Sequence, residues 1–411
     1  MVSAKDLIET PDDLPIFGTF SEDFRPVAEA FVRNFVELGD FGASVCVYYQ
    51  GNPVVDLTGG WSSKNRQEPY DQDRLQMVFS STKGAVTVCA LQLIENGLLD
   101  PDARVVEYWP TFAKGNPKKA QTTVRDVFSH RAGLPVIDAT LTLEEILSWD
   151  PVILALEHQD PIWDPGSRHG YHALTFGWLA GELVARITGT SIGEYFSKHV
   201  AGPLGLEFWI GLPADYEDRV SPLRIAPLSQ MGSIDHLDPA LIELASKFLT
   251  PDSLMVRALT LNGSFGQFMG GKGPFNSPEV HQAQIPAANG ITNARSLAKM
   301  YGAVAARVDG VSLVGPATLK DGLVELSCGP DAVLPSQSRF GFGFMLADDE
   351  FVPMVGANSF GHSGAGGSLG FGDATHEIGF GYVMNQMRLN ITADERQRNL
   401  IDALRSSLEV N

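Results

Sequence analysis

The chain has 411 residues, of which 44% are hydrophobic and 19% charged, a composition typical of a globular protein with a large core and room for two lobes. Acidic side chains outnumber basic ones by 49 to 30, and the net charge of −19 argues against nucleic acid or an anionic membrane as a partner. The N-terminus lacks a basic segment followed by an apolar one, and no apolar run reaches the roughly 18 residues of a membrane span, so we expect a soluble cytoplasmic protein.

The first predicted elements are a helix and a hairpin. Apolar residues recur at helical spacing from Phe24 to Glu37, which predicts a surface helix. Two β-rich runs come next, at 43–49 and 54–57, and Gln50-Gly51-Asn52-Pro53 between them has the composition of a turn. The N-terminal part of the chain therefore supplies strands to a sheet.

The next predicted element is a helix that begins at Ser80 and Ser81, two good N-cap residues, and ends before Gly97. Its residues are apolar on almost every face, which predicts a helix buried on all sides.

Ser80 and Lys83 in this helix form a Ser-x-x-Lys motif with a chemical meaning. Residues three apart are neighbours on one helical face, with Cβ atoms roughly 5–6 Å apart, so the amine can take the hydroxyl proton. Burial disfavours the ammonium form and lowers the pKa of the lysine, while the helix N-terminus offers N–H groups to an oxyanion. The pair is therefore a candidate nucleophile with its base.

A second Ser-x-x-Lys, formed by Ser296 and Lys299, lies in a stretch where apolar residues recur at helical spacing. Both residues fall among its polar positions, so we interpret this copy as a solvated helix face.

Further along the chain, a Pro- and Gly-rich loop at 163–170 runs into an amphipathic helix that ends near Gly189, and Tyr171 precedes the first turn of this helix. A tyrosine at such a position either packs in the core or serves catalysis, and the residues alone leave both interpretations open.

The last part of the chain is again β-rich, with runs at 340–346, 368–372 and 378–384 before a final helix from Glu395 to Leu408. The prediction is an α/β fold of the α+β type, in which an antiparallel sheet from both termini carries flanking helices and an inserted helical lobe. We expect a sheet domain from 1–78 and 288–411, a mainly helical domain from 79–287, and an active site in the cleft between them.

The segment 360–368 is dense in glycine where a strand is expected. Glycine within a strand allows close approach of a ligand or another backbone, which suits a strand that lines the cleft and offers an N–H to a carbonyl. A plain glycine-rich turn is the alternative.

Taken together, the three patches resemble the serine β-lactamase and penicillin-binding-protein superfamily, and especially its esterase branch, the family VIII carboxylesterases. That family has Ser-x-x-Lys at the start of a buried helix, a later tyrosine, and Lys-Thr-Gly or a small-residue equivalent on a late strand. The likeness extends from about Phe24 to Met387. The matching stretches, in order, are Ser80 with Lys83, Phe128 to Pro135, Tyr171, Ala288 to Ile291, and His362-Ser363-Gly364.

Two departures from the β-lactamase pattern bear on the substrate. Ala173 stands where that pattern has asparagine, and His362 where it has lysine. A histidine with an unperturbed pKa near ~6.5 is mostly neutral at pH 7 and offers little to a substrate carboxylate. The departures are compatible with an uncharged ester.

Other sequence signals compete with this interpretation. Gly366-Gly367-Ser368-Leu369-Gly370 matches the nucleophile elbow of α/β-hydrolases, but residues 369–373 have the composition of strand and turn rather than helix. Four histidines, His169, His172, His281 and His376, have no metal-ligand spacing, and no cofactor motif is present, so we infer neither metal nor cofactor. The three cysteines, Cys46, Cys89 and Cys328, are expected to be reduced thiols.

The resemblance implies a carboxylesterase that acts through an acyl-enzyme on Ser80, with Lys83 and Tyr171 accepting the serine proton and Tyr171 protonating the departing alcohol. The backbone N–H groups of Ser80 and Ala365 would hold the oxyanion, and 362–364 would contact a small ester substrate.

The alternatives are a β-lactamase or D-alanyl carboxypeptidase, an acyltransferase with the same acyl-enzyme, and a non-catalytic binding protein. Nothing in the sequence indicates the acyl group, the alcohol or the oligomeric state. The segment 228–284 either lines an acyl pocket or is irregular packing.

Overall fold

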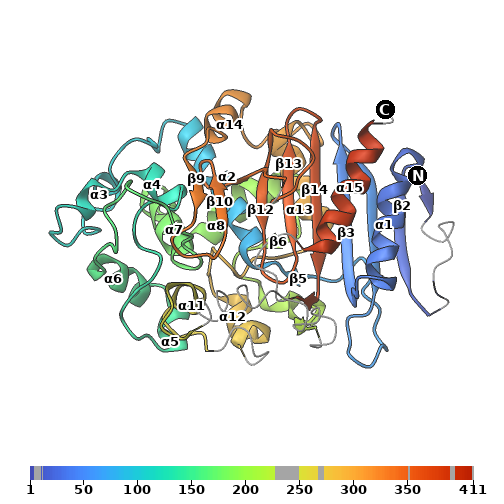
Figure 1. The fold of residues 1–411 in the computed structure, drawn as a ribbon, viewed down its shortest axis with the longest axis horizontal. Coiled ribbons are helices and arrows are strands. Elements are labelled where there is room, and N and C mark those ends of the chain that lie inside the picture. Colours follow the sequence, from blue (N-terminus) through green and yellow to red (C-terminus); the bar gives the residue numbers. More distant parts are fainter. Residues whose placement is uncertain are drawn as a thin grey trace.

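The computed structural model describes residues 1–3, 11, 13–226, 250–266, 273–349, 352–388 and 394–409. Its centre is a ten-stranded antiparallel sheet to which both ends of the chain contribute (Figure 1). In spatial order the strands are β1 (Val2–Ser3), β2 (Ile16–Phe20), β4 (Asn52–Gly60), β3 (Gly42–Tyr49), β14 (Ile378–Met384), β13 (Leu369–Asp373), β12 (Ser359–Ser363), β11 (Met345–Leu346), β10 (Gln337–Phe340) and β9 (Ser327–Pro330).

Most helices of the middle of the chain lie to one side of this sheet, beyond β9 and β10 (Figure 1). The helices, in chain order, are α1 (Arg25–Val36), α2 (Thr82–Glu95), α3 (Val105–Tyr108), α4 (Val124–Phe128), α5 (Leu143–Leu147), α6 (Asp150–His158), α7 (Thr175–Thr188), α8 (Ile192–Phe196), α9 (Gly202–Leu204), α11 (Leu254–Thr260), α12 (Pro278–Gln282), α13 (Ala294–Ala305), α14 (Pro316–Gly322) and α15 (Glu395–Glu409). Two small sheets join β5 (Gln76–Met77), β8 (Ile291–Thr292) and β6 (Phe208–Trp209), and β7 (Arg224–Ile225) with β15 (Gln386–Met387).

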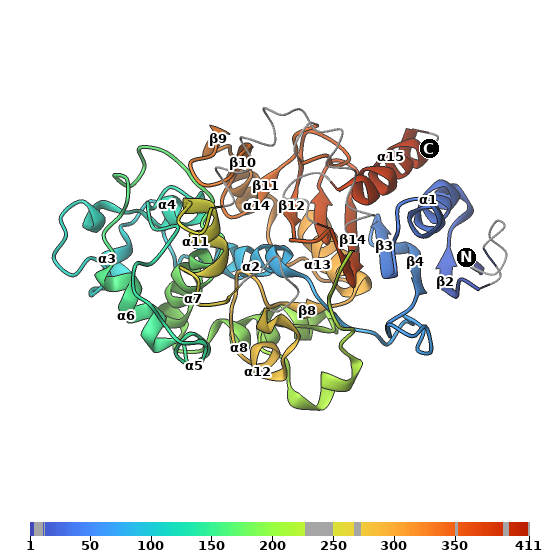
Figure 2. The ribbon, with the colours of Figure 1, turned by 60° about the horizontal axis from the view of Figure 1, so that its bottom comes forward.

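Helices cover both faces of the large sheet. Figure 2 shows α1 and α15 packed together on one side of β3 and β14, with α13 on the other side. The glycines of β13 and β14 explain how closely α13 approaches. Gly370 pairs with Gly381 and Gly372 with Gly379, and a Cβ on any of these four would collide with α13 or a side chain beside it. Glycine in these strands therefore serves helix packing.

Several predicted elements are confirmed. The N-terminal helix is α1, the hairpin is β3 and β4, and the helix after Tyr171 ends where Gly189 adopts a φ of 71°. The Ser-x-x-Lys helix α2 ends at Glu95, two residues before Gly97, which has a φ of 69°. The predicted fold, an antiparallel sheet from both termini with flanking helices, is confirmed, while the division into two domains stays a prediction.

The β-rich run predicted at 340–346 is not one continuous strand. The segment forms two short strands, β10 and β11, which pair through Phe340 and Met345 around a turn. Gly343 has a φ of 75°, and a Cβ there would collide with Thr87 of α2. The alternation of Phe and Gly suggested a strand, but the close contact with α2 requires a turn. Within the described ranges, no helix combines the length and the apolar character needed to cross a bilayer.

Candidate active site

The Ser80 hydroxyl lies at a sharp turn between β5 and α2. Phe79 has a φ of 45°, a left-handed conformation that is unusual for a bulky residue. Phe79, Ser80 and Ser81 form a 3₁₀ turn, in which Ser80 alone is partly exposed. Backbone strain of this kind concentrates at functional sites, and here it lies directly before the partly exposed Ser80.

The prediction that a serine caps α2 is wrong. Ser81 makes no capping hydrogen bond, and its hydroxyl instead donates to the His362 carbonyl at 3.1 Å and lies 3.1 Å from Ser368 Oγ. A capping hydroxyl oxygen accepts a hydrogen bond from an N–H group of the first helical turn, whereas the Ser81 hydroxyl is engaged with β12. Ser81 therefore joins the turn Phe79–Ser81, called the nucleophile turn below, to strand β12.

Lys83 is fully buried, and its Nζ has three partners: Ser80 Oγ at 3.1 Å and the carbonyl oxygens of Ala173 at 2.8 Å and Ala287 at 3.0 Å. Burial holds the pKa of Lys83 well below its ordinary value. A neutral amine has two N–H donors and one lone pair. When the two carbonyls take the donors, the lone pair is left for the Ser80 hydroxyl proton.

The Ala287 carbonyl is held in place by a short loop. Asn289, which is fully buried, accepts a hydrogen bond from Ile285 N and donates to the Val280 and Ala283 carbonyls. The loop is tied to the nucleophile turn, because Val78 N donates to the Gly290 carbonyl at 2.9 Å. This is the structural role of the stretch 288–291 that matched the family pattern.

Tyr171 lies in the loop before α7, with its ring 4.9 Å from Lys83 Nζ and its hydroxyl interacting with the Ser80 side chain. Burial raises the pKa of the Tyr171 phenol, so the hydroxyl stays protonated. Its backbone N–H donates to Asp331 Oδ1 at 3.0 Å, and the same oxygen accepts from Val333 N and Leu334 N. The structure thus places the side chains of Ser80, Lys83 and Tyr171 side by side, and their catalytic roles stay a prediction.

His362, Ser363 and Gly364 lie at the end of β12, where the strand extends beyond its short neighbour β11. His362 Nδ1 donates to the Ser363 carbonyl at 2.7 Å, and its Nε2 has no hydrogen-bond partner in the described part of the chain. Burial, with a contribution from Lys83, lowers the pKa of His362 to about 3. The imidazole is therefore neutral at physiological pH.

Gly364 starts the loop that carries Ala365. A Cβ on Gly364 would collide with the Val78 carbonyl and Ser368 Oγ, so only glycine fits against the nucleophile turn. The turn is closed by hydrogen bonds from Gly367 N to the Gly364 carbonyl and from Gly364 N to the Ser368 carbonyl. Across the residues that the structure describes, the Ala365 N–H has no acceptor, as an oxyanion donor requires.

Two further buried histidines surround the site. His130 lies with its ring 5.0 Å from that of Tyr171, and its Nδ1 accepts from His172 N at 3.1 Å. His172 Nε2 accepts from Leu134 N, and burial lowers the pKa of His172 to about 4. The pKa of His130 lies well below its ordinary value for the same reason. These imidazoles build a neutral, desolvated wall behind Tyr171.

The rival serines have structural roles. Ser368 is buried, donates to the Val78 carbonyl at 2.7 Å, and precedes a strand, so it is not a nucleophile elbow. Ser296 is not on a solvated face as predicted: it is buried, and its Oγ accepts from Glu207 N at 2.9 Å. Lys299 pairs with Asp309 instead of with Ser296. The contact with Glu207, just before β6, explains the difference, because it covers Ser296 on α13 and leaves no trace in the local spacing.

The four histidines considered as metal ligands are engaged elsewhere. His169 contacts Ser338, His172 lies between Gly170 and Leu134, His281 contacts Glu217 and Phe275, and His376 contacts Asp373. Among the described residues, no group of three or more His, Cys, Asp or Glu side chains could hold a metal ion.

The predicted acyl-pocket segment 228–284 lies partly outside the described residues, including Met231, Phe268 and Met269. Its described part reaches the nucleophile turn, because Phe275 packs edge-on against Phe79 at 5.2 Å and stacks on Phe265 at 5.3 Å. These rings support the turn that carries Ser80.

Sequence reasoning missed the groups that orient the site. The Ala173 and Ala287 carbonyls, Asp331 and His130 were not singled out. Backbone carbonyls carry no residue signature, and the carboxylate of Asp331 meets Tyr171 only in the folded chain. The signal in the sequence that could have pointed to some of these groups was the family likeness of the stretches Phe128 to Pro135 and Ala288 to Ile291.

Comparison with known proteins agrees with this geometry. The family model described as Beta-lactamase matches residues 29–405. The chain is 32% identical to "Esterase/beta-lactamase LipL" of Mycobacterium tuberculosis, over 90% of this chain and 83% of that protein. A family VIII carboxylesterase structure superposes with a TM-score of 0.84 at 32% identity, covering 96% of this chain and all of that one. A penicillin-binding-protein homologue from Caulobacter crescentus gives 0.81 at 33% identity, with 96% and 100% coverage.

Proposed function

Because the chain belongs to the beta-lactamase family, we propose that it is a serine carboxylesterase that cleaves its substrate through an acyl-enzyme on Ser80. The family match and the similar proteins confirm the family predicted from the three motifs, and they also confirm the likeness to family VIII carboxylesterases. The observation that carries the proposal is the set of contacts around Lys83 Nζ. Two carbonyls hold the amine, and its remaining partner is the hydroxyl of the partly exposed serine.

In the proposed acylation step, Ser80 Oγ attacks the ester carbonyl while its proton passes to neutral Lys83. The carbonyl oxygen becomes an oxyanion, which the N–H groups of Ser80 and Ala365 stabilise. Each such donor is worth on the order of 10²–10³ in rate. As the tetrahedral intermediate collapses, the C–O bond to the alcohol breaks and leaves the acyl group on Ser80.

Tyr171 serves as the proton carrier in this scheme. Its hydroxyl interacts with Ser80 and its raised pKa keeps it neutral, so it can donate to the departing alkoxide and be reprotonated by the Lys83 ammonium. Water then attacks the acyl-enzyme, gives its proton back through the same groups, and releases the acid. Lys83 ends neutral, as it began.

The substrate class proposed is an uncharged small ester. His362 stands where the β-lactamase pattern has lysine, and with a pKa of about 3 it supplies no positive charge to a substrate carboxylate. The buried, neutral wall of His130 and His172 likewise favours an uncharged acyl or alcohol group over an ion.

The test is hydrolysis of p-nitrophenyl acetate and butyrate beside a chromogenic cephalosporin, with wild type and Ser80→Ala in parallel. We expect ester turnover in the wild type, its loss in Ser80→Ala, and slow cephalosporin opening. Ester turnover that survives in Ser80→Ala would overturn the assignment of the nucleophile.

A β-lactamase is the second candidate, because the same Ser80, Lys83 and Tyr171 would open a β-lactam ring and one relative carries both activities in its name. Cephalosporin opening at rates rivalling ester hydrolysis would favour it.

A further inference from the structure

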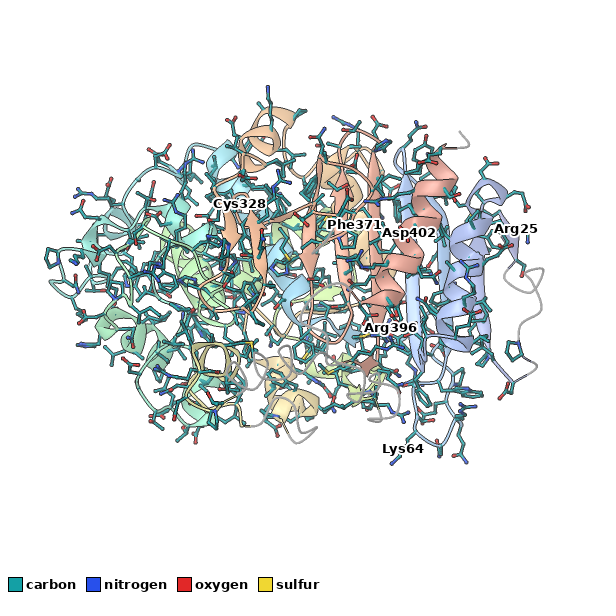
Figure 3. The ribbon with its side chains drawn as sticks, in the orientation of Figure 1. Arg25, Lys64, Cys328, Phe371, Arg396 and Asp402 are labelled. Carbon is teal, nitrogen blue, oxygen red and sulfur yellow. The ribbon has the colours of Figure 1, made fainter. Side chains whose placement is uncertain are left out.

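The loop that carries the Ala365 N–H is held from behind by the first turn of α15. Arg396 Nη2 donates to the Gly366 carbonyl at 2.7 Å. Gln397 Nε2 donates to the Gly367 carbonyl at 2.9 Å and to the Ser368 carbonyl at 3.1 Å. Three consecutive carbonyls after Ala365 are thus bound by two neighbouring side chains. Figure 3 shows Arg396 at the N-terminal end of α15, against the sheet.

Arg396 is itself immobilised. It is fully buried, and all five N–H donors of a guanidinium are accounted for. Besides the Gly366 carbonyl, the acceptors are Asp40 at 2.8 Å, the Gln386 carbonyl at 2.9 Å and both oxygens of Asp394 at 3.0 and 2.6 Å. Asp40 also accepts from the Tyr382 hydroxyl at 2.6 Å. A planar fork with every donor bound has little freedom to move.

The loop 364–368 packs closely against the Arg396 guanidinium and Met387. A Cβ on Gly367 would collide with the Arg396 guanidinium, and a Cβ on Gly366 would meet Met387. At its far end the loop reaches the nucleophile turn, through the contact of Ser368 Oγ with Ser81 Oγ and its bond to the Val78 carbonyl. The two segments that carry the proposed oxyanion donors are therefore joined, and α15 holds one of them.

We infer that Arg396 and Gln397 are positioning residues that hold the Ala365 N–H in place for the oxyanion. Neither side chain touches the reacting atoms, and both act through the carbonyls of 366–368. The inference rests on the proposed esterase function. Since a misplacement of about 1 Å can cost on the order of 10²-fold in rate, loosening this loop should lower kcat while substrate binding persists.

Three variants test the inference. Gln397→Met keeps the side-chain volume and leaves the buried ion cluster intact, but removes both bonds to the loop. Arg396→Lys keeps the charge and loses the fork. Tyr382→Phe is the matched control, because it removes a hydrogen bond to Asp40 in the same cluster without touching the loop.

For each variant we would measure kcat and KM on p-nitrophenyl butyrate, the unfolding temperature, and the inhibition constant of an aliphatic trifluoromethyl ketone. The ketone adds to Ser80 and places its hemiketal oxyanion where the ester oxyanion would lie. We expect Gln397→Met and Arg396→Lys to lower kcat by about 10- to 100-fold with KM within about threefold, and to weaken the ketone by a matching factor. Tyr382→Phe should lose thermal stability and retain kcat.

A folded Gln397→Met with unchanged kcat and unchanged ketone affinity would overturn the inference, as would a loss of kcat in Tyr382→Phe equal to that of the other two. Failure of the underlying function looks different. In that case the wild type itself would lack Ser80-dependent ester turnover, whatever the variants do.

Discussion

At the scale of single residues, the proposed mechanism depends on which form of each group is present. Burial holds the pKa of Lys83 well below its ordinary value, lowers that of His362 to about 3 and raises that of Tyr171, which keeps its proton. An exposed lysine would be an ammonium at pH 7 and could not accept the serine proton. In the proposed mechanism, desolvation of Lys83 is therefore what makes the Ser-x-x-Lys motif a nucleophile with its base.

Lys83→Met should lower kcat/KM by on the order of 10²–10⁴, the usual worth of a general base. In the wild type, kcat/KM should fall as pH falls through the lowered pKa of Lys83, because protonation removes the base. Steady-state ester hydrolysis across pH measures both effects.

The chain offers a matched control for this substitution. Lys119 is also buried and donates to three carbonyls, those of Leu156, Glu157 and Gln159 at 2.5–2.9 Å, but it is bonded to none of the site residues. Lys119→Met should cost stability and leave kcat/KM unchanged. Equal activity losses in the two variants would mean that Lys83 is structural.

At the scale of elements, the position of the nucleophile depends on how α2 packs against its neighbours. Gly84 follows Lys83, and a Cβ there would collide with the hydroxyl of Tyr301 on α13. The Tyr301 hydroxyl is buried and has no hydrogen-bond partner among the described residues. The distance between α2 and α13 at this point therefore depends on Gly84, which has no side chain, facing the Tyr301 ring.

Gly84→Ala should destabilise the protein by about 1–3 kcal/mol through overpacking. Tyr301→Phe should be close to neutral, since it removes a hydroxyl that makes no bond. The double variant should regain part of the loss, since a Cβ at position 84 would still lie 2.9 Å from the ring Cζ at position 301, and a double-mutant cycle by urea unfolding measures the coupling. Additive effects would show that α2 moves freely to accept the methyl group.

At the scale of the whole molecule, the buried histidines couple the fold to pH. In the folded state, burial lowers the pKa of His172 to about 4 and that of His362 to about 3, against roughly 6.5 in the unfolded chain. The unfolded state therefore binds more protons between these values. Above about pH 6.5 these histidines are neutral in both states and do not lower the free energy of unfolding. Below that pH the unfolded chain takes up protons that the folded protein does not, so the free energy of unfolding falls.

We expect the free energy of unfolding to fall by about 1.4 kcal/mol per pH unit for each such histidine between roughly pH 6 and 4. Urea unfolding at a series of pH values measures the slope. His172→Gln should reduce the slope of the free energy of unfolding against pH by the contribution of one histidine. An unchanged slope in that variant would show that His172 is not protonated on unfolding in this range.

The sequence by itself determined the family, the sheet from both termini, and the Ser80, Lys83 and Tyr171 set. The pair of Ser80 and Lys83 follows from a spacing of three on a helix, and the sheet follows from β-rich runs at both ends of the chain, whereas Tyr171 and the family rest on the resemblance of the three ordered motifs. Three local patterns misled, the turn within the β-rich run 340–346, the Ser81 cap and the solvated face at Ser296, and they share one cause. In each, a contact with an element distant in sequence overrides the local preference.

Only the tertiary structure decided what surrounds the nucleophile. The carbonyls that orient Lys83 come from residues 173 and 287, and the side chains that hold the Ala365 loop come from α15. A carbonyl is the same on every residue, so its role has no trace in residue type. The buried pairing of Arg396 with Asp40 joins positions 356 apart, which no local pattern reports. The chemistry was therefore readable from the sequence, and its positioning was not.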